Sequence, residues 1–244
     1  MQFALRQQLL DAACEPYRTA GNFHFRWARG KLGGDPVFTF LLEQGTLTQR
    51  ARVLDLGCGR GLLAAWFLTA ERLAATGQWP ASFEVPKKMT FRGVDLDAGG
   101  CMAGNRALKP LFGDRVSLIG GDMCCADLSG YDAITILDVL HYIPFSQQDV
   151  LLDQIRAALG LGGLLVTRIG NAQGGWRFRV SQWVDLIMAN AQGHRIRSMY
   201  CRPLNDWIRA LESRGFAVTA QPMADGTPFA NVLLVAHVPI SSKI

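Results

Sequence analysis

The sequence predicts an α/β fold in which helices cover a mostly parallel sheet, and two observations carry this prediction. Seven short apolar runs alternate with longer stretches of helical pattern along the 244 residues, and strand, helix, strand in succession gives right-handed crossovers and parallel strands. The last two runs are separated only by "ADGTPFA", which is too short for a crossover helix. We therefore expect the last strand to run antiparallel.

Apolar runs define the expected strands, which lie at 52–56, 91–96, 116–119, 133–138, 163–168, 217–221 and 232–237. Helices are expected near 2–13, 36–48, 60–73, 98–108, 147–159, 177–190 and 203–214. The first two helices precede the sheet. Pro203 begins the last helix and Gly215 ends it. Pro80 and Pro86 predict a loop between the first crossover helix and the second strand.

The composition is that of a chain with one sizeable core, because 49% of the residues are hydrophobic. We expect an N-terminal helical lid over 1–50, and a main domain over 51–244 with an insertion near 171–200. The start, "MQFALRQQLLDAACEP", is interrupted by polar residues, and no later stretch is apolar enough to span a bilayer. A cytoplasmic protein is expected.

Six cysteines lie at 14, 58, 101, 124, 125 and 201, without a C-x-x-C pair. Adjacent Cys124 and Cys125 are poorly placed for a structural metal, so no metal site is expected. All six are expected to be reduced, buried side chains. The formal charge of +5 leaves a polyanionic partner open, and arginines gather between Arg168 and Arg202, a region interpreted as an acceptor surface.

The stretch "VLDLGCGRG", residues 53–61, is typical of a strand followed by a glycine turn and a helix. Such a turn at the carboxyl end of a parallel strand is where ligands bind. A P-loop is excluded, because Leu62 and Leu63 follow the last glycine instead of a lysine and a hydroxyl residue. A dinucleotide is disfavoured, because its third glycine is missing. A nucleoside with an amino-acid tail, or a turn that binds nothing, stays open.

Carboxylates follow the next three strands: Asp95 in "GVDLD", Asp122 in "GGDM" and Asp138 in "ILDVLHYIP". An acid after the second strand can accept hydrogen bonds from both ribose hydroxyls, and one after the third can accept from an adenine amino group. Each of them is alternatively a helix N-cap. Their recurrence at successive strand ends favours a binding site.

These segments, with "LGLGGLLVTRIG" at 159–170, resemble in order the motifs of the class I S-adenosylmethionine-dependent methyltransferases. The resemblance covers roughly residues 50 to 170. It implies a Rossmann-like three-layer sandwich with a seven-stranded sheet, and S-adenosyl-L-methionine as cofactor. The implied cofactor-binding residues are Asp55, Gly57, Cys58, Gly59 and Gly61 for the methionine end, Asp95 and Leu96 for the ribose, Asp122 and Met123 for the adenine, Leu137 and Asp138 for the amino group, and Arg29.

Methyl transfer chiefly requires that a nucleophile be held in line with the methyl group, and a base helps only if the nucleophile is a hydroxyl or similar group. His141 is the candidate general base because histidine titrates near neutral pH, and Tyr142 is a second candidate. A histidine that only shapes the loop is an equal alternative. His24, Arg29 or Lys31 of the N-terminal lid could reach the cofactor or the acceptor, although solvated helix charges are the simpler interpretation.

A predicted helix over 176–190 carries aromatic residues on one face, which is typical of a helix packed on the core. In the family that the motifs resemble, a helix inserted here often covers the acceptor pocket instead. A small hydrophobic or aromatic acceptor is therefore expected. The N-terminal segment also resembles bacterial methyltransferases of aryl-polyene pigment synthesis, which implies a phenolic acceptor on an acyl-carrier protein. "LDVLHY" lacks the Pro-Pro-aromatic pattern of nucleic-acid N-methyltransferases, so a nucleic acid is disfavoured. An NAD(P)-dependent oxidoreductase and a catalytically silent binding module remain alternatives.

Overall fold

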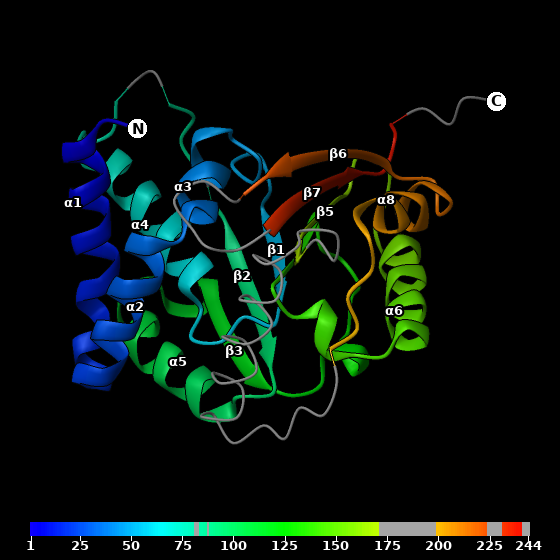
Figure 1. Ribbon diagram of the computed structural model, residues 1–244. Coiled ribbons are helices and arrows are strands. Elements are labelled where there is room, and N and C mark those ends of the chain that lie inside the picture. The colour runs from blue at the N-terminus through cyan, green and yellow to red at the C-terminus, as the bar shows by residue number, and fades with distance from the viewer. Residues whose placement is uncertain (81–82, 87, 171–198, 224–230, 241–244) are drawn as a thin grey trace. The chain divides into compact units, whose positions relative to one another are not determined.

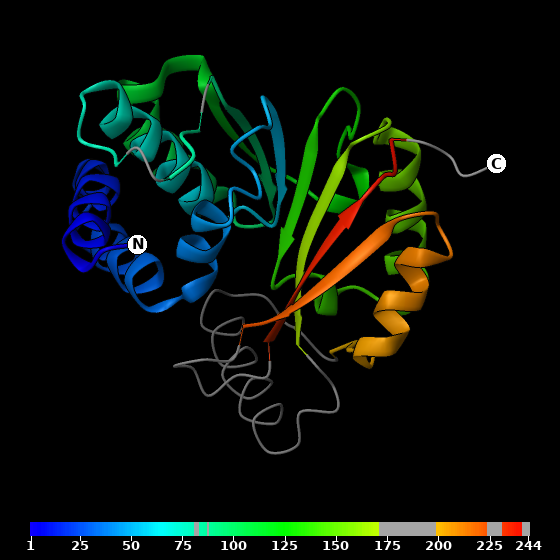
Figure 2. The same cartoon turned by 90° about the horizontal axis from the view of Figure 1, so that it is seen from above.

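The computed structural model describes residues 1–80, 83–86, 88–170, 199–223 and 231–240. The chain divides into two compact units, Met1–Ala126 and Asp127–Ile244. Figure 1 shows the elements along the chain, and Figure 2 shows them from above. The helix expected at 177–190 lies outside the described residues.

Three parallel strands form the sheet of the first unit, in the order β3-β2-β1. They are β1 (Arg52–Leu56), β2 (Thr90–Asp95) and β3 (Val116–Gly120). The strands are connected by α4 (Leu62–Ala75) and α5 (Ala98–Phe112), and short 3-10 turns follow at Gly113–Arg115 and Met123–Cys125. Because the strands are parallel, their carboxyl ends share one edge, where Leu56, Asp95 and Gly120 lie.

Local sequence explains both crossover helices. The residues of α4 from Leu62 to Ala70 are all buried, which matches their almost uninterrupted apolar sequence. Asp97 caps α5 by accepting a hydrogen bond from the Gly100 backbone N–H at 2.8 Å. Gly113, with φ of 57°, follows the last residue of α5 and ends the helix.

The N-terminal segment contains more helix than the sequence predicted. It consists of α1 (Phe3–Cys14), a 3-10 turn (Glu15–Ala20), α2 (Asn22–Gly34) and α3 (Pro36–Glu43). Sequence reasoning missed α2 because glycines lower helix propensity and the helix fully buries only Ala28 and Leu32. The predicted end of α3 at 48 was wrong, because Gly45 adopts a φ of 63° after the helix.

The strands of the second unit follow the order β4-β5-β7-β6. They are β4 (Ala133–Leu137), β5 (Leu164–Gly170), β6 (Ala217–Pro222) and β7 (Asn231–His237). The β4 and β5 strands are parallel, whereas β7 pairs antiparallel with both β5 and β6. The predicted antiparallel last strand is thus confirmed. Figure 2 shows α6 (Phe145–Ala158) and α8 (Leu204–Glu212) on the same side of these strands.

The environments of the cysteines differ from the expectation of six buried thiols. Cys14, Cys58 and Cys101 are buried, but Cys124 and Cys201 are partly exposed and Cys125 is exposed. The two cysteines at 124 and 125 lie in the 3-10 turn after β3, where little of the chain packs over them. Within the described ranges, no helix has the length and apolar character needed to cross a membrane.

Candidate active site

The glycine turn after β1 depends on backbone conformations that favour glycine. Gly57, Gly59 and Gly61 have φ values of 80°, 52° and 73°. The turn is tied to β2 by the Gly57 N–H, which donates to the Val94 carbonyl oxygen at 2.8 Å. A Cβ on Gly59 would meet nothing within 4 Å, whereas one on Gly61 would lie 2.7 Å from Leu118 Cδ1. Gly59 therefore faces open space, and Gly61 allows close packing beneath the turn.

Asp95 ties the ends of β2 and the glycine turn together. Its Oδ2 accepts from the Gly59 N–H at 2.8 Å, and its Oδ1 accepts from the Asp97 N–H at 2.8 Å. The Asp95 carbonyl accepts from Gly121 at the end of β3. The side chain remains partly exposed, and Leu96 beside it is 66% exposed. Each carboxylate oxygen keeps acceptor capacity for a ligand hydroxyl. Asp55, in contrast, is buried within β1.

Asp122 is exposed, and its Oδ1 accepts a hydrogen bond from the Cys124 N–H at 2.9 Å. It is therefore the N-cap of the short 3-10 turn that includes Met123. The sequence allows a helix N-cap as the alternative to a ligand-binding role for this residue. Capping uses one carboxylate oxygen. Recognition of an adenine by the other oxygen, with partly exposed Met123 beside it, stays a prediction.

Arg60 lies in the glycine turn and connects it with α2. Its Nε donates to His24 Nδ1 at 2.9 Å, and its guanidinium lies 5.0 Å from the centre of the Trp27 ring and 5.5 Å from that of Phe23. Tyr17 is fully buried and its hydroxyl donates to the Arg60 carbonyl at 2.8 Å. Sequence reasoning missed this cluster, although an arginine between two turn glycines was visible in the motif.

The basic residues expected to act from the N-terminal lid have different surroundings. His24 contacts the glycine turn through Arg60, and burial, followed by the Arg60 charge, lowers the pKa of its imidazole. Arg29 instead pairs with the Asp11 carboxylate of α1, and Lys31 pairs with Asp35 at 2.8 Å. A role of Arg29 in cofactor binding stays a prediction.

In the second unit, the end of β4 contains a strained residue. Asp138 adopts a φ of 62°, which L-residues other than glycine rarely adopt, directly after Leu137. Arg168 of β5, which is 3% exposed, holds it there: Arg168 Nε donates to Asp138 Oδ1 at 2.7 Å and Nη2 donates to Oδ2. This bidentate ion pair fixes the backbone at Leu137 and Asp138, where the cofactor amino group is predicted to bind.

His141 and Tyr142 lie in a 3-10 turn, Leu140–Tyr142, just beyond Asp138. Their rings are in edge contact, with centroids 4.1 Å apart, and His141 is 8% exposed whereas Tyr142 is partly exposed. Burial lowers the pKa of His141 to about 4, and the nearby Asp138 charge opposes this only in part. The expectation that His141 titrates near neutral pH was therefore wrong, because sequence position does not reveal burial.

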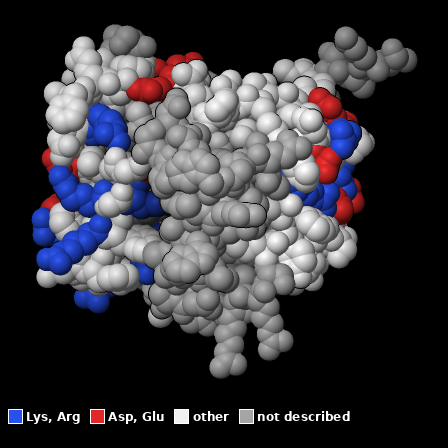
Figure 3. Space-filling view, in the orientation of Figure 1, with Lys and Arg blue, Asp and Glu red and all other residues white. Residues whose placement is uncertain are grey.

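The arginines interpreted as an acceptor surface do not all serve that purpose. Arg168 is buried in its ion pair with Asp138, and Arg202 binds Asp149 at 2.8 Å. The arginines at 177, 179, 195 and 197 lie outside the described residues. Figure 3 shows basic side chains gathered over the N-terminal helices of the first unit instead. The described part of the chain contains no group of three or more His, Cys, Asp or Glu side chains that could hold a metal ion.

A glycine turn after β1 and acids after β2 and β3 lie at the carboxyl ends of parallel strands, which is where open α/β sheets bind ligands. A methyltransferase domain model matches residues 27–221, so the chain belongs to that methyltransferase family. Solved methyltransferase structures share its fold, and the α/β fold predicted from its sequence is confirmed. No curated protein matches the sequence.

Several solved structures share the fold at low sequence identity. An O-methyltransferase family protein from Burkholderia thailandensis has a TM-score of 0.63 at 16% identity, over 92% of this chain and 63% of that one. This chain thus spans less than two thirds of that protein's length. Magnesium protoporphyrin IX methyltransferase from Synechocystis, with bound S-adenosylhomocysteine, has a TM-score of 0.58 at 16% identity, over 96% and 98% of the two chains.

A third similar structure is an O-methyltransferase from neocarzinostatin biosynthesis in complex with S-adenosylmethionine and a hydroxy-methyl-naphthoic acid. Its TM-score is 0.59 at 17% identity, over 90% of this chain and 58% of that one.

Proposed function

We propose that the protein transfers the methyl group of S-adenosylmethionine to a hydroxyl of a small aromatic acceptor. The single observation that carries this proposal is the cluster of aromatic side chains beside the buried imidazole of His141 after β4. Tyr142 lies against His141, and the Phe145 and Tyr200 rings meet at 5.5 Å in edge geometry. The Tyr200 N–H donates to the His141 carbonyl at 2.8 Å, which brings these side chains to one region of the second unit.

The chemistry of these side chains suits an aromatic acceptor. Edge-to-face contacts favour a planar ring over a flexible polar chain, and a neutral imidazole can accept the proton of a hydroxyl as it is methylated. We propose His141 as that base, with Tyr142 as the residue that orients the acceptor. Because a base with a pKa of about 4 takes a proton with little driving force, we expect a modest contribution from His141, and most of the rate from positioning.

We propose that the glycine turn and Asp95 of the first unit bind the cofactor. Gly59 faces open space, and the carboxylate of Asp95 is partly exposed while two backbone N–H groups orient it. We propose that Gly57, Gly59 and Gly61 admit the methionine end, that Asp95 and Leu96 bind the ribose, and that Asp122 and Met123 bind the adenine. Bound S-adenosylmethionine supplies an electrophilic methyl group. Asp55 and Cys58 are both buried, and we propose that they order the turn rather than contact the cofactor directly.

The names of three similar structures support this acceptor class. The naphthoic acid in the neocarzinostatin enzyme is a phenolic aromatic, and further similar structures are human N-acetylserotonin methyltransferase and a mitomycin 7-O-methyltransferase. We include acceptors attached to an acyl-carrier protein in the proposal, since the exposed basic side chains of the first unit would favour an acidic partner.

Calorimetry followed by an acceptor screen tests the proposal. We expect S-adenosylmethionine and S-adenosylhomocysteine to bind with Kd values on the order of micromolar, and NAD and ATP to give no heat. Phenols, catechols and carrier-bound hydroxyaryl acids are then incubated with radiolabelled cofactor. Methylation only of aliphatic or amine acceptors would contradict the aromatic-hydroxyl assignment. Cofactor binding without any transfer would favour the silent binding module.

A further inference from the structure

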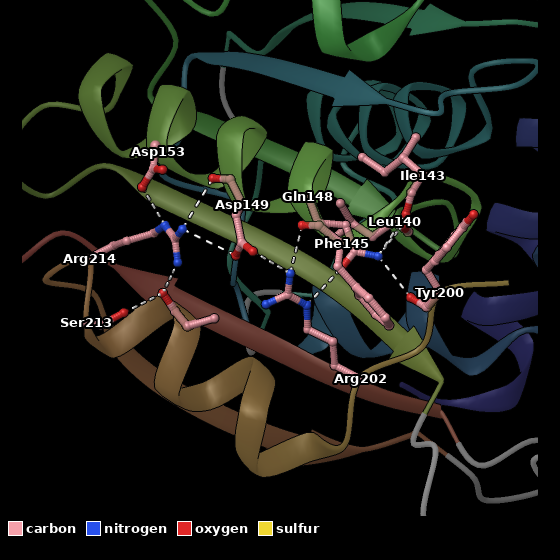
Figure 4. Close-up of polar contacts among 11 residues, drawn as sticks. Leu140, Ile143, Phe145, Gln148, Asp149, Asp153, Tyr200, Arg202, Ser213 and Arg214 are labelled. Atoms are coloured by element: carbon pink, nitrogen blue, oxygen red, sulfur yellow. Dashed lines mark hydrogen bonds and ion pairs between the residues drawn. The ribbon is translucent and has the colours of Figure 1, made fainter.

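A single glutamine of α6 holds the loop that carries His141 and Tyr142. Gln148 is 0% exposed, and its Nε2 lies 3.0 Å from the Leu140 carbonyl oxygen and 3.1 Å from that of Ile143. These two carbonyls bracket the candidate catalytic residues. Figure 4 shows the carboxamide directed toward this loop.

The same Nε2 also reaches the segment that leads into α8. It donates to the Tyr200 carbonyl at 2.9 Å, and the Tyr200 N–H in turn donates to the His141 carbonyl. Gln148 therefore links the 140–143 loop to Tyr200, which lies 52 residues after Gln148 in the sequence, and both segments contribute aromatic side chains to the proposed acceptor region. The amide has two hydrogens for three carbonyls, so at least one hydrogen is shared.

The orientation of the carboxamide is set by its other end. Arg202 Nε donates to Gln148 Oε1 at 2.9 Å, so the oxygen faces the guanidinium and the nitrogen faces the three carbonyls. Arg202 is itself fixed by the Asp149 carboxylate at 2.8 Å and by the Phe145 carbonyl at 2.9 Å. A buried amide with partners on both ends is a rigid, directional clamp.

We infer that Gln148 is a positioning residue, which holds the His141–Tyr142 loop and the Tyr200 segment in one fixed arrangement through its carboxamide N–H groups. The inference rests on the proposed function, since it assigns Gln148 the role of shaping the acceptor side of that site. Gln148 is not proposed to touch the acceptor or the cofactor. Its effect on catalysis passes through the loop that it holds.

Two substitutions of Gln148 distinguish a side chain that donates hydrogen bonds to the loop carbonyls from one that only fills space. Gln148→Met keeps the length of the side chain but donates nothing, and Gln148→Glu keeps its shape and its partner Arg202 but directs a carboxylate oxygen at three carbonyl oxygens. If Gln148 only fills space or pairs with Arg202, the protein should tolerate Gln148→Glu. If Gln148 donates to the three carbonyls, this substitution should loosen the loop.

Arg214→Met is the matched control. Arg214 is also an α6–α8 connection, because it binds the Asp149 and Asp153 carboxylates and the Ala210 carbonyl. Figure 4 shows it on the far side of Asp149 from Gln148. Among the described residues, its hydrogen bonds and ion pairs go to Asp149, Asp153 and Ala210 and not to the loop, so its loss should leave the loop unchanged.

Backbone amide hydrogen exchange, followed by mass spectrometry, measures the local stability of the loop and requires neither cofactor nor acceptor. We expect peptides covering 139–143 and 199–202 to exchange about tenfold faster in both Gln148 variants, and at the wild-type rate in Arg214→Met. Wild-type exchange in Gln148→Glu, or equal acceleration in the Arg214 control, would overturn the inference. If Gln148→Met fails to fold by circular dichroism, Gln148→Asn, whose amide is one methylene short, replaces it under the same criteria.

Kinetics adds a readout that separates this inference from the proposed function. With an acceptor from the screen, kcat should fall about tenfold in Gln148→Glu while the cofactor Kd stays within about twofold of wild type. An unchanged kcat despite a loosened loop would overturn the positioning role. Absence of transfer by the wild-type protein would instead refute the proposed function, and the exchange data would still decide whether Gln148 holds the loop.

Discussion

Asp95 combines two tasks in one partly exposed side chain. Its carboxylate receives the backbone N–H groups of Gly59 and Asp97, and its remaining acceptor capacity is where we propose that ribose hydroxyls bind. A carboxylate oriented by backbone donors needs little rearrangement to receive a ligand, because its position is already fixed.

Asp95→Ala is expected to weaken cofactor binding by roughly 1.5 to 3 kcal/mol, because charged hydrogen bonds to two hydroxyls are lost. Isothermal calorimetry measures the change, and circular dichroism verifies the fold. Asp97→Ala is the control, since it removes the cap of α5 but no proposed ligand of the ribose. If a folded Asp95→Ala variant bound the cofactor as tightly as the wild type, Asp95 would not contact the ribose and would have only a structural role.

His141 presents a different case, because its environment limits its chemistry. The imidazole stays neutral at physiological pH since burial lowers its pKa to about 4. We expect His141→Asn to lower kcat roughly 10²-fold, the lower end for a general base. The kcat of the wild type should show no inflection near pH 6.5. Radiometric assays from pH 5 to 9 measure both, with Tyr142→Phe assayed alongside to separate the two side chains. Full activity of His141→Asn would reject the base but not methyl transfer.

At the scale of elements, the glycine turn joins β1 to α4 with three residues of positive φ. These glycines are not equivalent, because Gly59 faces open space whereas Gly61 packs against Leu118 of β3. Their conformations are shared, but their surroundings differ. A side chain at Gly59 would therefore add only backbone strain, whereas a side chain at Gly61 would add both backbone strain and a clash.

Gly61→Ala should destabilise the protein by about 2 to 4 kcal/mol, since left-handed strain adds to a clash with Leu118. Gly59→Ala carries only the strain, about 1 to 2 kcal/mol, but places a methyl group where we propose the cofactor approaches. Urea denaturation measures the first effect and cofactor calorimetry the second. A Gly59→Ala variant with wild-type affinity would contradict close approach of the cofactor to this turn.

At the scale of the whole molecule, one buried imidazole connects stability to pH. Folding lowers the pKa of His141 from 6.5 to about 4, so between these values the unfolded chain binds a proton that the folded chain does not. Stability therefore falls as pH falls through this window, by up to about 3 kcal/mol, and this loss is absent above pH 6.5.

Denaturation of wild type and His141→Asn between pH 7 and 4 tests this expectation. The difference between their free energies of unfolding should shift in favour of the variant as pH falls. Carboxylates with lowered pKa values, such as Asp11 and Asp149, are common to both proteins and cancel in the comparison. A difference that stays constant with pH would mean that the imidazole is accessible to water in the folded state.

The sequence by itself determined the order and type of most elements. The apolar runs predicted the seven strands. The short connection between the last two runs predicted their antiparallel pairing, because a short connection cannot contain a crossover helix. Positive φ at Gly57, Gly59 and Gly61 could likewise be anticipated from the motif. Helix α2 could not, since its glycines and polar residues give a weak local signal and its position depends on contacts with other elements of the first unit.

Only the tertiary structure decided how the site residues are held. The arginine that clamps Asp138 lies thirty residues away on β5, and the side-chain partners of Gln148 come from two separate segments. Arg60 similarly meets His24 of α2 across the first unit. The pKa of His141 follows from the burial of its side chain in the folded protein. Hydrogen bonding and desolvation act through space, whereas a sequence pattern reports only neighbours along the chain.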